Sequence, residues 1–190
     1  ITMLFLLKRY KRERIIAQGI NKREVRFVPL KKVGIACVVY YVTSQQSAQQ
    51  LPQVVELLEE SGIKFKILLL EKKRGLLKKL GLLPLREESR YVVVEKREYN
   101  WLGIPKGKAF AELMQEEISP YIIPNMQGLF LFDYIACKAN TLFTIGMKEQ
   151  RDLYKMIIRS ADGTPLSQLD FVAQAPHNMS VINSDEDNEK

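Results

Sequence analysis

Residues 33–42 read Val-Gly-Ile-Ala-Cys-Val-Val-Tyr-Tyr-Val, a run in which nearly every side chain is apolar. A second run, Phe-Lys-Ile-Leu-Leu-Leu at 65–70, follows a segment whose apolar residues recur at helical spacing. A strand that is apolar at every position is buried on both faces, which happens when crossover helices cover a parallel sheet. The two runs and the helix between them therefore predict an α/β fold.

The same alternation continues along the chain and predicts the remaining elements. Thr43 and Ser44 are suited to cap the helix after the first strand, and Gly62 is suited to close it. We expect strands at 33–42, 64–70, 91–95, 121–123 and 142–145, a sixth extended segment at 152–158, and helices at 3–19, 45–61, 108–117, 128–140 and 165–173. Together they predict a three-layer Rossmann-like sandwich with a mostly parallel five- or six-stranded sheet. In such sheets ligands bind outside the carboxyl ends of the strands, where the strand order reverses.

Positive charge is concentrated near the amino-terminal end. Between Lys8 and Lys32 there are ten Lys and Arg and two Glu, a surplus of eight, whereas the whole 190-residue chain carries a net charge of +7. A local surplus of this kind points to an anionic partner. We expect a basic N-terminal helix or arm at 1–21, a single α/β domain at 22–175 and a disordered acidic tail at 176–190.

The cysteine and histidine residues argue against several kinds of site. Cys37 and Cys137 lie in apolar patterns without C-x-x-C spacing, so we expect reduced thiols that pack as small hydrophobic side chains in a cytoplasmic protein. His177 is the only histidine, and one His with two distant Cys offers no zinc site. No apolar run approaches the ~20 residues of a membrane-spanning helix. We predict no metal and no cofactor.

The turn after the first strand lacks glycine. It reads Tyr-Val-Thr-Ser-Gln-Gln at 41–46, whereas a dinucleotide-binding turn needs glycine beside the pyrophosphate and a P-loop needs glycines followed by Lys and Ser or Thr. This argues against an ordinary NAD-dependent enzyme or nucleoside triphosphatase. The carboxylates near strand ends, Glu71, Glu95 and Glu98, each have a basic neighbour and are explained by surface pairing. We therefore assign no catalytic residue and expect a non-enzymatic protein.

The N-terminal helix combines apolar and basic residues in the manner of an interfacial helix. Residues 4–7 are Leu-Phe-Leu-Leu, and a cluster of cations follows. The residues that we expect to bind an anionic partner are Lys8, Arg9, Lys11, Arg12 and Arg14. This pattern favours the inner face of a membrane as the partner, with the protein cytoplasmic and peripheral to it. Nucleic acid is disfavoured because no aromatic-and-basic ladder or helix-turn-helix pattern is present. Alternatively, the arm packs as an ordinary helix on the domain or on a second copy in a homo-oligomer.

A rival interpretation is a ligand-binding or transferase-like domain for a nucleotide-sugar or another phosphate-bearing ligand. The loop Asn-Trp-Leu-Gly-Ile-Pro-Lys at 100–106 holds the only tryptophan, which could stack on a ligand ring while Lys106 binds a phosphate. Alternatively, Trp101 fixes the loop to the core and the lysine is solvated. The expected pocket residues, at the carboxyl ends of the strands, are Ser44, Asn100, Trp101, Lys106, Asn125 and Gln127. Such a pocket requires Trp101 to lie within ~10 Å of Asn125 and Gln127.

Several motifs occur in a characteristic order. After the basic helix and the strand at 33–42 come Tyr-Asn-Trp-Leu-Gly-Ile-Pro-Lys at 99–106, Tyr-Ile-Ile at 121–123, Tyr-Ile-Ala-Cys-Lys-Ala at 134–139 and Asp-Leu-Tyr-Lys-Met-Ile at 152–157. This order resembles a family of small, uncharacterised bacterial α/β proteins over about residues 3–173, and the resemblance implies no activity or catalytic residue.

A second resemblance concerns residues 118–146. The sequence Asn-Met-Gln-Gly at 125–128, followed by a helix and Phe-Thr-Ile-Gly at 143–146, is similar to the acceptor half of heptosyltransferase-like glycosyltransferases. That family places a nucleotide-sugar cleft between two such domains, of which this chain supplies one. It also usually has an acidic residue where Asn125 stands.

Overall fold

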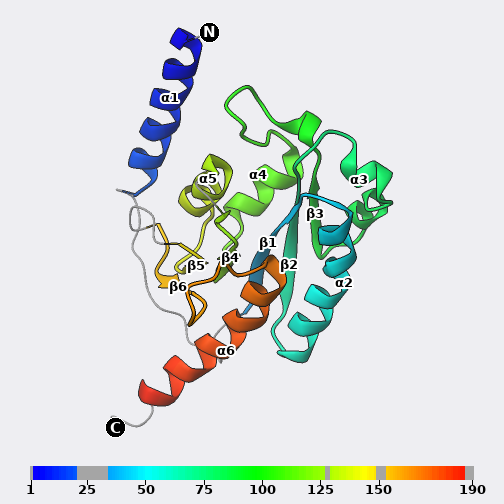
Figure 1. The fold of residues 1–190 in the computed structure, drawn as a ribbon, viewed down its shortest axis with the longest axis vertical. Coiled ribbons are helices and arrows are strands. Elements are labelled where there is room, and N and C mark those ends of the chain that lie inside the picture. The colour runs from blue at the N-terminus through cyan, green and yellow to red at the C-terminus, as the bar shows by residue number, and fades with distance from the viewer. Residues whose placement is uncertain (1, 21–33, 127–128, 149–152, 187–190) are drawn as a thin grey trace.

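The chain forms a six-stranded sheet, parallel at every pairing, with helices on both faces (Figure 1). The structure is a computed structural model and describes residues 2–20, 34–126, 129–148 and 153–186. The strands are β1 (Ala36–Val42), β2 (Phe65–Glu71), β3 (Tyr91–Val94), β4 (Tyr121–Ile123), β5 (Thr144–Gly146) and β6 (Met156–Ile157). The helices are α1 (Thr2–Ile20), α2 (Gln45–Glu60), α3 (Leu76–Lys79), α4 (Lys108–Gln115), α5 (Phe130–Lys138) and α6 (Gln168–Glu186), and two 3-10 turns are η2 (Leu83–Glu87) and η3 (Lys96–Glu98). The predicted α/β, Rossmann-like fold is confirmed.

The strand order is β3-β2-β1-β4-β5-β6, so it reverses between β1 and β4. β1 pairs with β2 along its whole length. It pairs with β4 only through two residue pairs, Cys37 with Tyr121 and Val38 with Ile122. Beyond Val38, the backbone of β1 therefore needs other partners on its β4 side. This divergence lies at the carboxyl ends of the strands, where the topology predicts a site.

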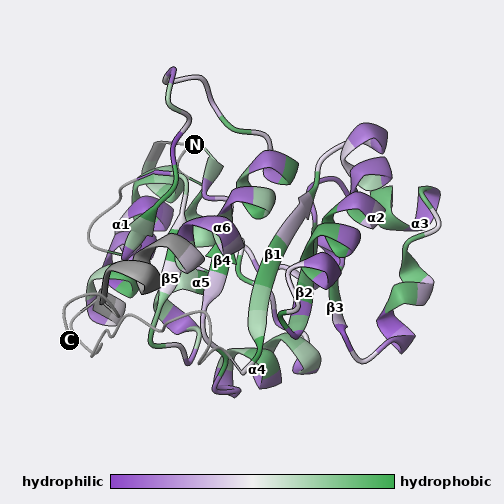
Figure 2. Ribbon diagram, turned by 90° about the horizontal axis from the view of Figure 1, so that it is seen from below, coloured by the Kyte–Doolittle hydropathy of each residue, from purple (hydrophilic) through white to green (hydrophobic). Residues whose placement is uncertain are grey.

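The core consists of two apolar layers, one on each face of the sheet. Side chains that alternate along a strand point to opposite faces, so Cys37, Val39 and Tyr41 pack with α4 and α5 whereas Val38 and Tyr40 pack with α2 and α6. Every residue of β1 is buried. Figure 2 shows hydrophobic strands between helices that carry both hydrophobic and hydrophilic residues. The three layers are thus those expected for a parallel sheet covered on both sides.

The last helix corrects the expectation of a helix at 165–173 followed by a disordered tail from 176. Instead α6 runs from Gln168 to Glu186 and continues through Pro176. Val172, Ala175 and Met179 are buried in the core layer that contains α2. Their spacing of three and four residues places them on one apolar face of the helix, against that layer. The burial of this face stabilises the helix and offsets the loss of the backbone hydrogen bond that Pro176 cannot donate. Residues 187–190 lie outside the described residues.

Both cysteines are buried, as the sequence predicts, and they are not joined by a disulfide. Burial in the core raises the pKa of the Cys37 thiol to about 12, which keeps it in the neutral form. β1 begins at Ala36, later than the expected 33, and the basic residues at 22–32 lie outside the described residues.

Candidate functional site

A cleft of about 1200 Å³ lies at the carboxyl ends of the strands. Its walls come from the segments that follow β1, β2, β4, β5 and β6 and from the first turns of α2 and α6. The lining residues are Tyr41, Thr43, Ser44, Gln46, Ser47, Gln50, Lys72, Asn125, Met126, Leu129, Met147, Lys148, Ile158, Arg159, Ser160, Gly163, Thr164, Pro165, Leu166, Ser167 and Gln168. The cleft is therefore at the reversal of strand order, the position that the fold class predicts.

The start of α2 forms one wall, and its two serines cap the helix. The Ser44 hydroxyl accepts a hydrogen bond from the Ser47 N–H at 3.3 Å. In return, the Ser47 hydroxyl accepts from the N–H groups of Ser44 (3.0 Å) and Thr43 (2.9 Å) and donates to the Ser44 carbonyl at 2.8 Å. This reciprocal capping box satisfies backbone donors that a helix end leaves free. Ser44 thus lines the cleft as a structural cap.

Gln168, the first residue of α6, closes the back of the cleft. Its side chain is buried and pairs with both backbone groups of one residue: Oε1 accepts from the Tyr41 N–H at 2.8 Å, and Nε2 donates to the Tyr41 carbonyl at 2.9 Å. Beyond Val38, β4 no longer pairs with β1, and the Gln168 side-chain amide binds the β1 backbone there instead. Gln168 is not among the predicted site residues, because nothing local in a polar helix start indicates a partner 127 residues away.

Asn125 joins the ends of β4 and β5. Its Oδ1 accepts from the N–H groups of Met147 (2.6 Å) and Lys148 (2.9 Å), and its Nδ2 donates to the Lys148 carbonyl at 2.7 Å. Asn125 is buried, and these bonds use both ends of its amide. It therefore shapes the wall of the cleft, whereas the neighbouring Lys148 ammonium is exposed.

The charges that line the cleft are all positive. Lys72, Lys148 and Arg159 come from three different strand ends, and the lining of this described cleft includes no Asp or Glu. The hydroxyls of Ser160 and Thr164 also line the cleft, and both donate to Asp162 Oδ1, at 2.5 Å and 2.7 Å. A concave site lined by several cations is suited to an anionic small molecule.

The loop with the only tryptophan lies elsewhere, so the six residues of the expected pocket do not come together. Ser44 and Asn125 line the cleft, but Asn100, Trp101 and Lys106 do not, and Gln127 lies outside the described residues. Asn100 Oδ1 instead accepts from the N–H groups of Leu102 (2.9 Å) and Ile104 (3.0 Å), which fixes the loop's own turn. The expectation failed because the loop after β3 folds towards α1, a helix distant in sequence.

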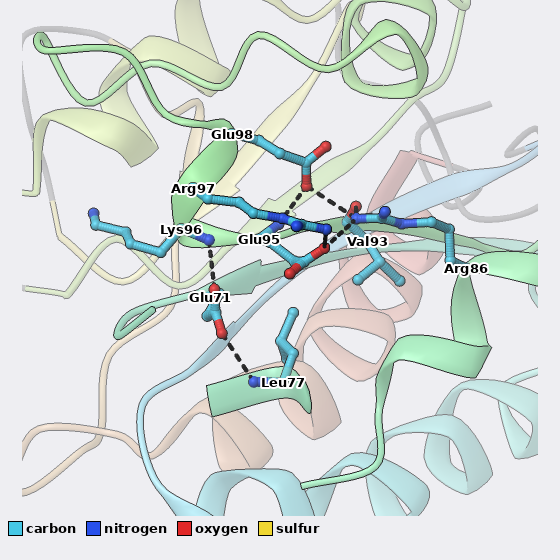
Figure 3. A network of polar contacts seen from close by, with 8 residues as sticks. All are labelled: Glu71, Leu77, Arg86, Val93, Glu95, Lys96, Arg97 and Glu98. Atoms are coloured by element: carbon cyan, nitrogen blue, oxygen red, sulfur yellow. Dashed lines mark hydrogen bonds and ion pairs between the residues drawn. The ribbon is translucent and has the colours of Figure 1, made fainter. Parts of the chain in front are cut away.

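The carboxylates expected near the strand ends form a structural network (Figure 3). Glu71, fully buried at the end of β2, accepts hydrogen bonds from the N–H groups of Leu77 in α3 and Lys96 in η3. Glu95 accepts from Arg86 at 3.3 Å and Arg97 at 2.9 Å. These groups join the crossover between β2 and β3 to the sheet, and none of them is among the residues that line the cleft.

The carboxyl-terminal half of the basic arm packs on the domain. Ile16 is 3% exposed, and Gly19 lies against Cys137 of α5 so closely that a Cβ there would stand 2.6 Å from the Cys137 Cβ. Arg12 donates from Nε (2.9 Å) and Nη2 (2.6 Å) to the Leu102 carbonyl, and its guanidinium lies 4.7 Å from the centre of the Phe130 ring. Of the five expected arm residues, Arg12 is thus bound within the protein.

The amino-terminal half of α1 has no such cover in the described structure. The exposed apolar side chains here are Met3, Leu4, Phe5, Leu6, Leu7 and Tyr10. Arg9 pairs with Glu13 at 3.3 Å on the surface, and Lys11 and Arg14 are exposed. Partial burial lowers the pKa of Lys8, and the neighbouring charges of Arg12 and Lys96 lower it further. Cations from α1 and from η3 therefore gather on one side of the molecule.

Comparison with known families now places the chain. A family described as "Family of unknown function (DUF6913)" matches residues 8–167. The chain belongs to the DUF6913 family. No curated protein and no solved structure matches the chain. The resemblance to an uncharacterised α/β family is thereby confirmed at the level of the family, and the likeness of residues 118–146 to glycosyltransferases stays a prediction from sequence. Within the described residues, no helix of this DUF6913 protein has the length and apolarity needed to cross a bilayer.

Proposed function

We propose that this DUF6913 protein binds the surface of an anionic membrane through the amino-terminal half of α1. The observation that carries the proposal is a run of exposed apolar side chains at 3–7 immediately followed by a band of cations at 8–14. Phe5 is 65% exposed, although burying such a side chain is ordinarily worth about 1.5–3 kcal/mol. A contiguous apolar surface of this kind marks an interaction site.

The geometry of α1 fits insertion of residues 3–7. Five consecutive residues point all round a helix, so no single face of the protein could cover them. At 1.5 Å per residue they span ~7.5 Å, which matches the ~5–10 Å depth that interfacial helices reach. Lys8, Arg9 and Lys11 then stand at the level of anionic headgroups, where each cation contributes about 1 kcal/mol. Since Ile16 and Gly19 fix the other half on α5, α1 projects from the body with its N-terminus outermost (Figure 1).

Vesicle flotation tests this proposal. We expect the full chain to float with vesicles that contain phosphatidylglycerol and much less with phosphatidylcholine alone. The double variant Lys8→Glu/Lys11→Glu should lower the partition coefficient at least about tenfold, because two headgroup contacts become repulsive. The matched control is Lys78→Glu/Lys79→Glu, which makes the same charge change at two exposed lysines of α3. An equal loss of vesicle binding in both double variants, or full binding by Lys8→Glu/Lys11→Glu, would contradict the proposal.

A second function has its own observation, the cationic cleft at the reversal of strand order. We propose that this cleft binds a small phosphate-bearing ligand. Lys72, Lys148 and Arg159 line the cleft, no carboxylate is among its described lining residues, and apolar side chains such as Met126 and Leu166 offer contacts to an organic moiety. The capped but polar start of α2 adds a favourable dipole for an anion.

Thermal unfolding with named probes tests this second function. Pyrophosphate, ADP and UDP-glucose are each added to the full chain, and we expect at least one to raise the melting temperature, because binding to the native state stabilises it. Lys72→Ala should abolish that increase, whereas Lys73→Ala, its exposed neighbour outside the cleft lining, should retain it. No increase with any probe, or an increase that survives Lys72→Ala, would refute the cleft as the site.

A further inference from the structure

The loop that carries Trp101 is a short, internally braced turn. Tyr99 and Pro105 form an antiparallel bridge, and Asn100 Oδ1 accepts the two hydrogen bonds described above. Gly103 supplies a positive φ of 84°, a conformation that favours glycine. The loop therefore holds Trp101 in a defined place, and at that place the indole is 50% exposed.

The loop is attached directly to the basic part of α1. Arg12 binds the Leu102 carbonyl through two nitrogens, and Lys11 Nζ lies 5.2 Å from the centre of the Trp101 ring. In the same loop, the centre of the Tyr99 ring lies 4.4 Å from Lys96 Nζ. The exposed indole thus lies beside Lys11, at the level of residues 11 and 12 of α1.

The position of Trp101 along α1 is informative. Lys11 is six residues beyond Phe5, a rise of ~9 Å along the helix. If residues 3–7 enter the acyl boundary, Trp101 lies at the headgroup level. Tryptophan is enriched at that level in membranes because its ring is apolar and its N–H finds polar partners there. A half-exposed tryptophan beside lysines is hard to explain by packing alone, since large aromatic side chains are usually covered.

We propose that the Trp101 loop is a second membrane contact, which together with the end of α1 fixes the orientation of the domain on an anionic bilayer. This inference rests on the membrane binding proposed above and names a further element of that surface. One helix end would leave the body free to tilt. Two contacts joined by Arg12 hold the domain in one orientation.

The chain provides its own reporter, because Trp101 is the only tryptophan. On addition of vesicles with phosphatidylglycerol, we expect its emission to move to shorter wavelength. Lipids brominated near the glycerol end of the acyl chain should quench it more than lipids brominated near the chain end. The variant Lys8→Glu/Lys11→Glu, which should bind at least about tenfold more weakly, is the control for both signals at a lipid concentration where the unaltered chain is mostly bound.

Flotation of Trp101→Ala gives an independent measure. We expect the partition coefficient to fall roughly fivefold, because the ring that prefers the membrane interface is lost, while Trp101→Phe retains most of it. Leu142→Ala is the matched control, since Leu142 is a half-exposed apolar residue before β5, at the opposite edge of the sheet, and should bind as the unaltered chain does.

The outcomes separate the two proposals. If the chain floats with anionic vesicles but the Trp101 emission is unchanged and Trp101→Ala binds normally, the second contact is refuted and membrane binding by α1 stands. If the unaltered chain does not float, membrane binding is refuted and the second contact with it. If emission shifts and Trp101→Ala weakens binding while Leu142→Ala does not, both hold.

Discussion

Gly146, the last residue of β5, has no room for a side chain. A Cβ there would stand 2.6 Å from Tyr154 Cδ1 and 3.0 Å from Asn125 Oδ1. We expect Gly146→Ala to lower the free energy of unfolding by about 1–3 kcal/mol, the usual cost of overpacking, as measured by urea denaturation. Gly34→Ala is the control, because nothing lies within 4 Å of a Cβ at that position. Equal stability of the two variants would contradict the close packing between β4, β5 and Tyr154.

Gln168→Glu tests the amide that completes β1. The introduced carboxylate could still accept from the Tyr41 N–H but would face the Tyr41 carbonyl, now 2.9 Å from Nε2. We expect the free energy of unfolding to fall by about 1–3 kcal/mol at pH 8, the cost of a buried polar group left without its hydrogen bond. Burial and the facing carbonyl raise the pKa of the introduced carboxyl in the folded state above its unfolded value.

The pH dependence of this variant has a definite sign. Since the raised folded pKa favours the protonated form, the stabilisation from protonation is present below the unfolded pKa and is lost as pH rises through the folded pKa. Relative to the unaltered chain, the loss in free energy of unfolding should therefore be smallest near pH 4 and largest at pH 8. Urea denaturation of both chains at the two pH values measures this difference. A deficit that does not change with pH would show that Gln168 does not pair with Tyr41 as described.

Among the elements, α3 depends most on one distant side chain. It has four residues, too few to be stable alone, and the buried Glu71 carboxylate holds its Leu77 N–H at 2.9 Å. Glu71→Gln keeps the shape but turns a donor towards one of the two N–H groups that the carboxylate now accepts. We expect about 1–3 kcal/mol of destabilisation and faster hydrogen exchange at Leu77 and Lys96.

The control for that experiment is Glu56→Gln on the exposed side of α2. It removes the same charge and should change neither the free energy of unfolding nor the exchange of those two amides. If Glu71→Gln behaves like Glu56→Gln, the network in Figure 3 does not stabilise the crossover between β2 and β3.

For the molecule as a whole, the two halves of α1 should contribute very differently to stability. Deleting residues 1–7 removes the exposed side chains of residues 3–7 and should change the free energy of unfolding by less than about 0.5 kcal/mol. Ile16→Ala truncates a buried side chain of the same helix and should lower the free energy of unfolding by about 2 kcal/mol or more. Urea denaturation of both variants tests this division. A large loss on deleting residues 1–7 would mean that the apolar end is covered by the protein itself.

Several features of the fold were predictable because they follow from local patterns. The apolar run within 33–42 is buried on both faces as β1, and the short strand at Tyr121–Ile123 lies where expected. The α6 helix was underestimated because polar residues and Pro176 obscure the face made by Val172, Ala175 and Met179. The position of the cleft was predicted, but only part of its lining was. Ser44 and Asn125 line the cleft, and the Trp101 loop does not.

By itself the sequence determined the α/β class, the basic arm and the edge of the sheet at which the cleft lies, because periodicity and charge are properties of neighbouring residues. Only the tertiary structure decided which distant groups meet. Gln168 reaches Tyr41 and Arg12 reaches Leu102 because hydrogen bonds follow proximity in space, and no local pattern encodes that proximity. The same packing holds Ile16 on the domain and leaves residues 3–7 exposed, which divides one helix into an anchored half and a free half.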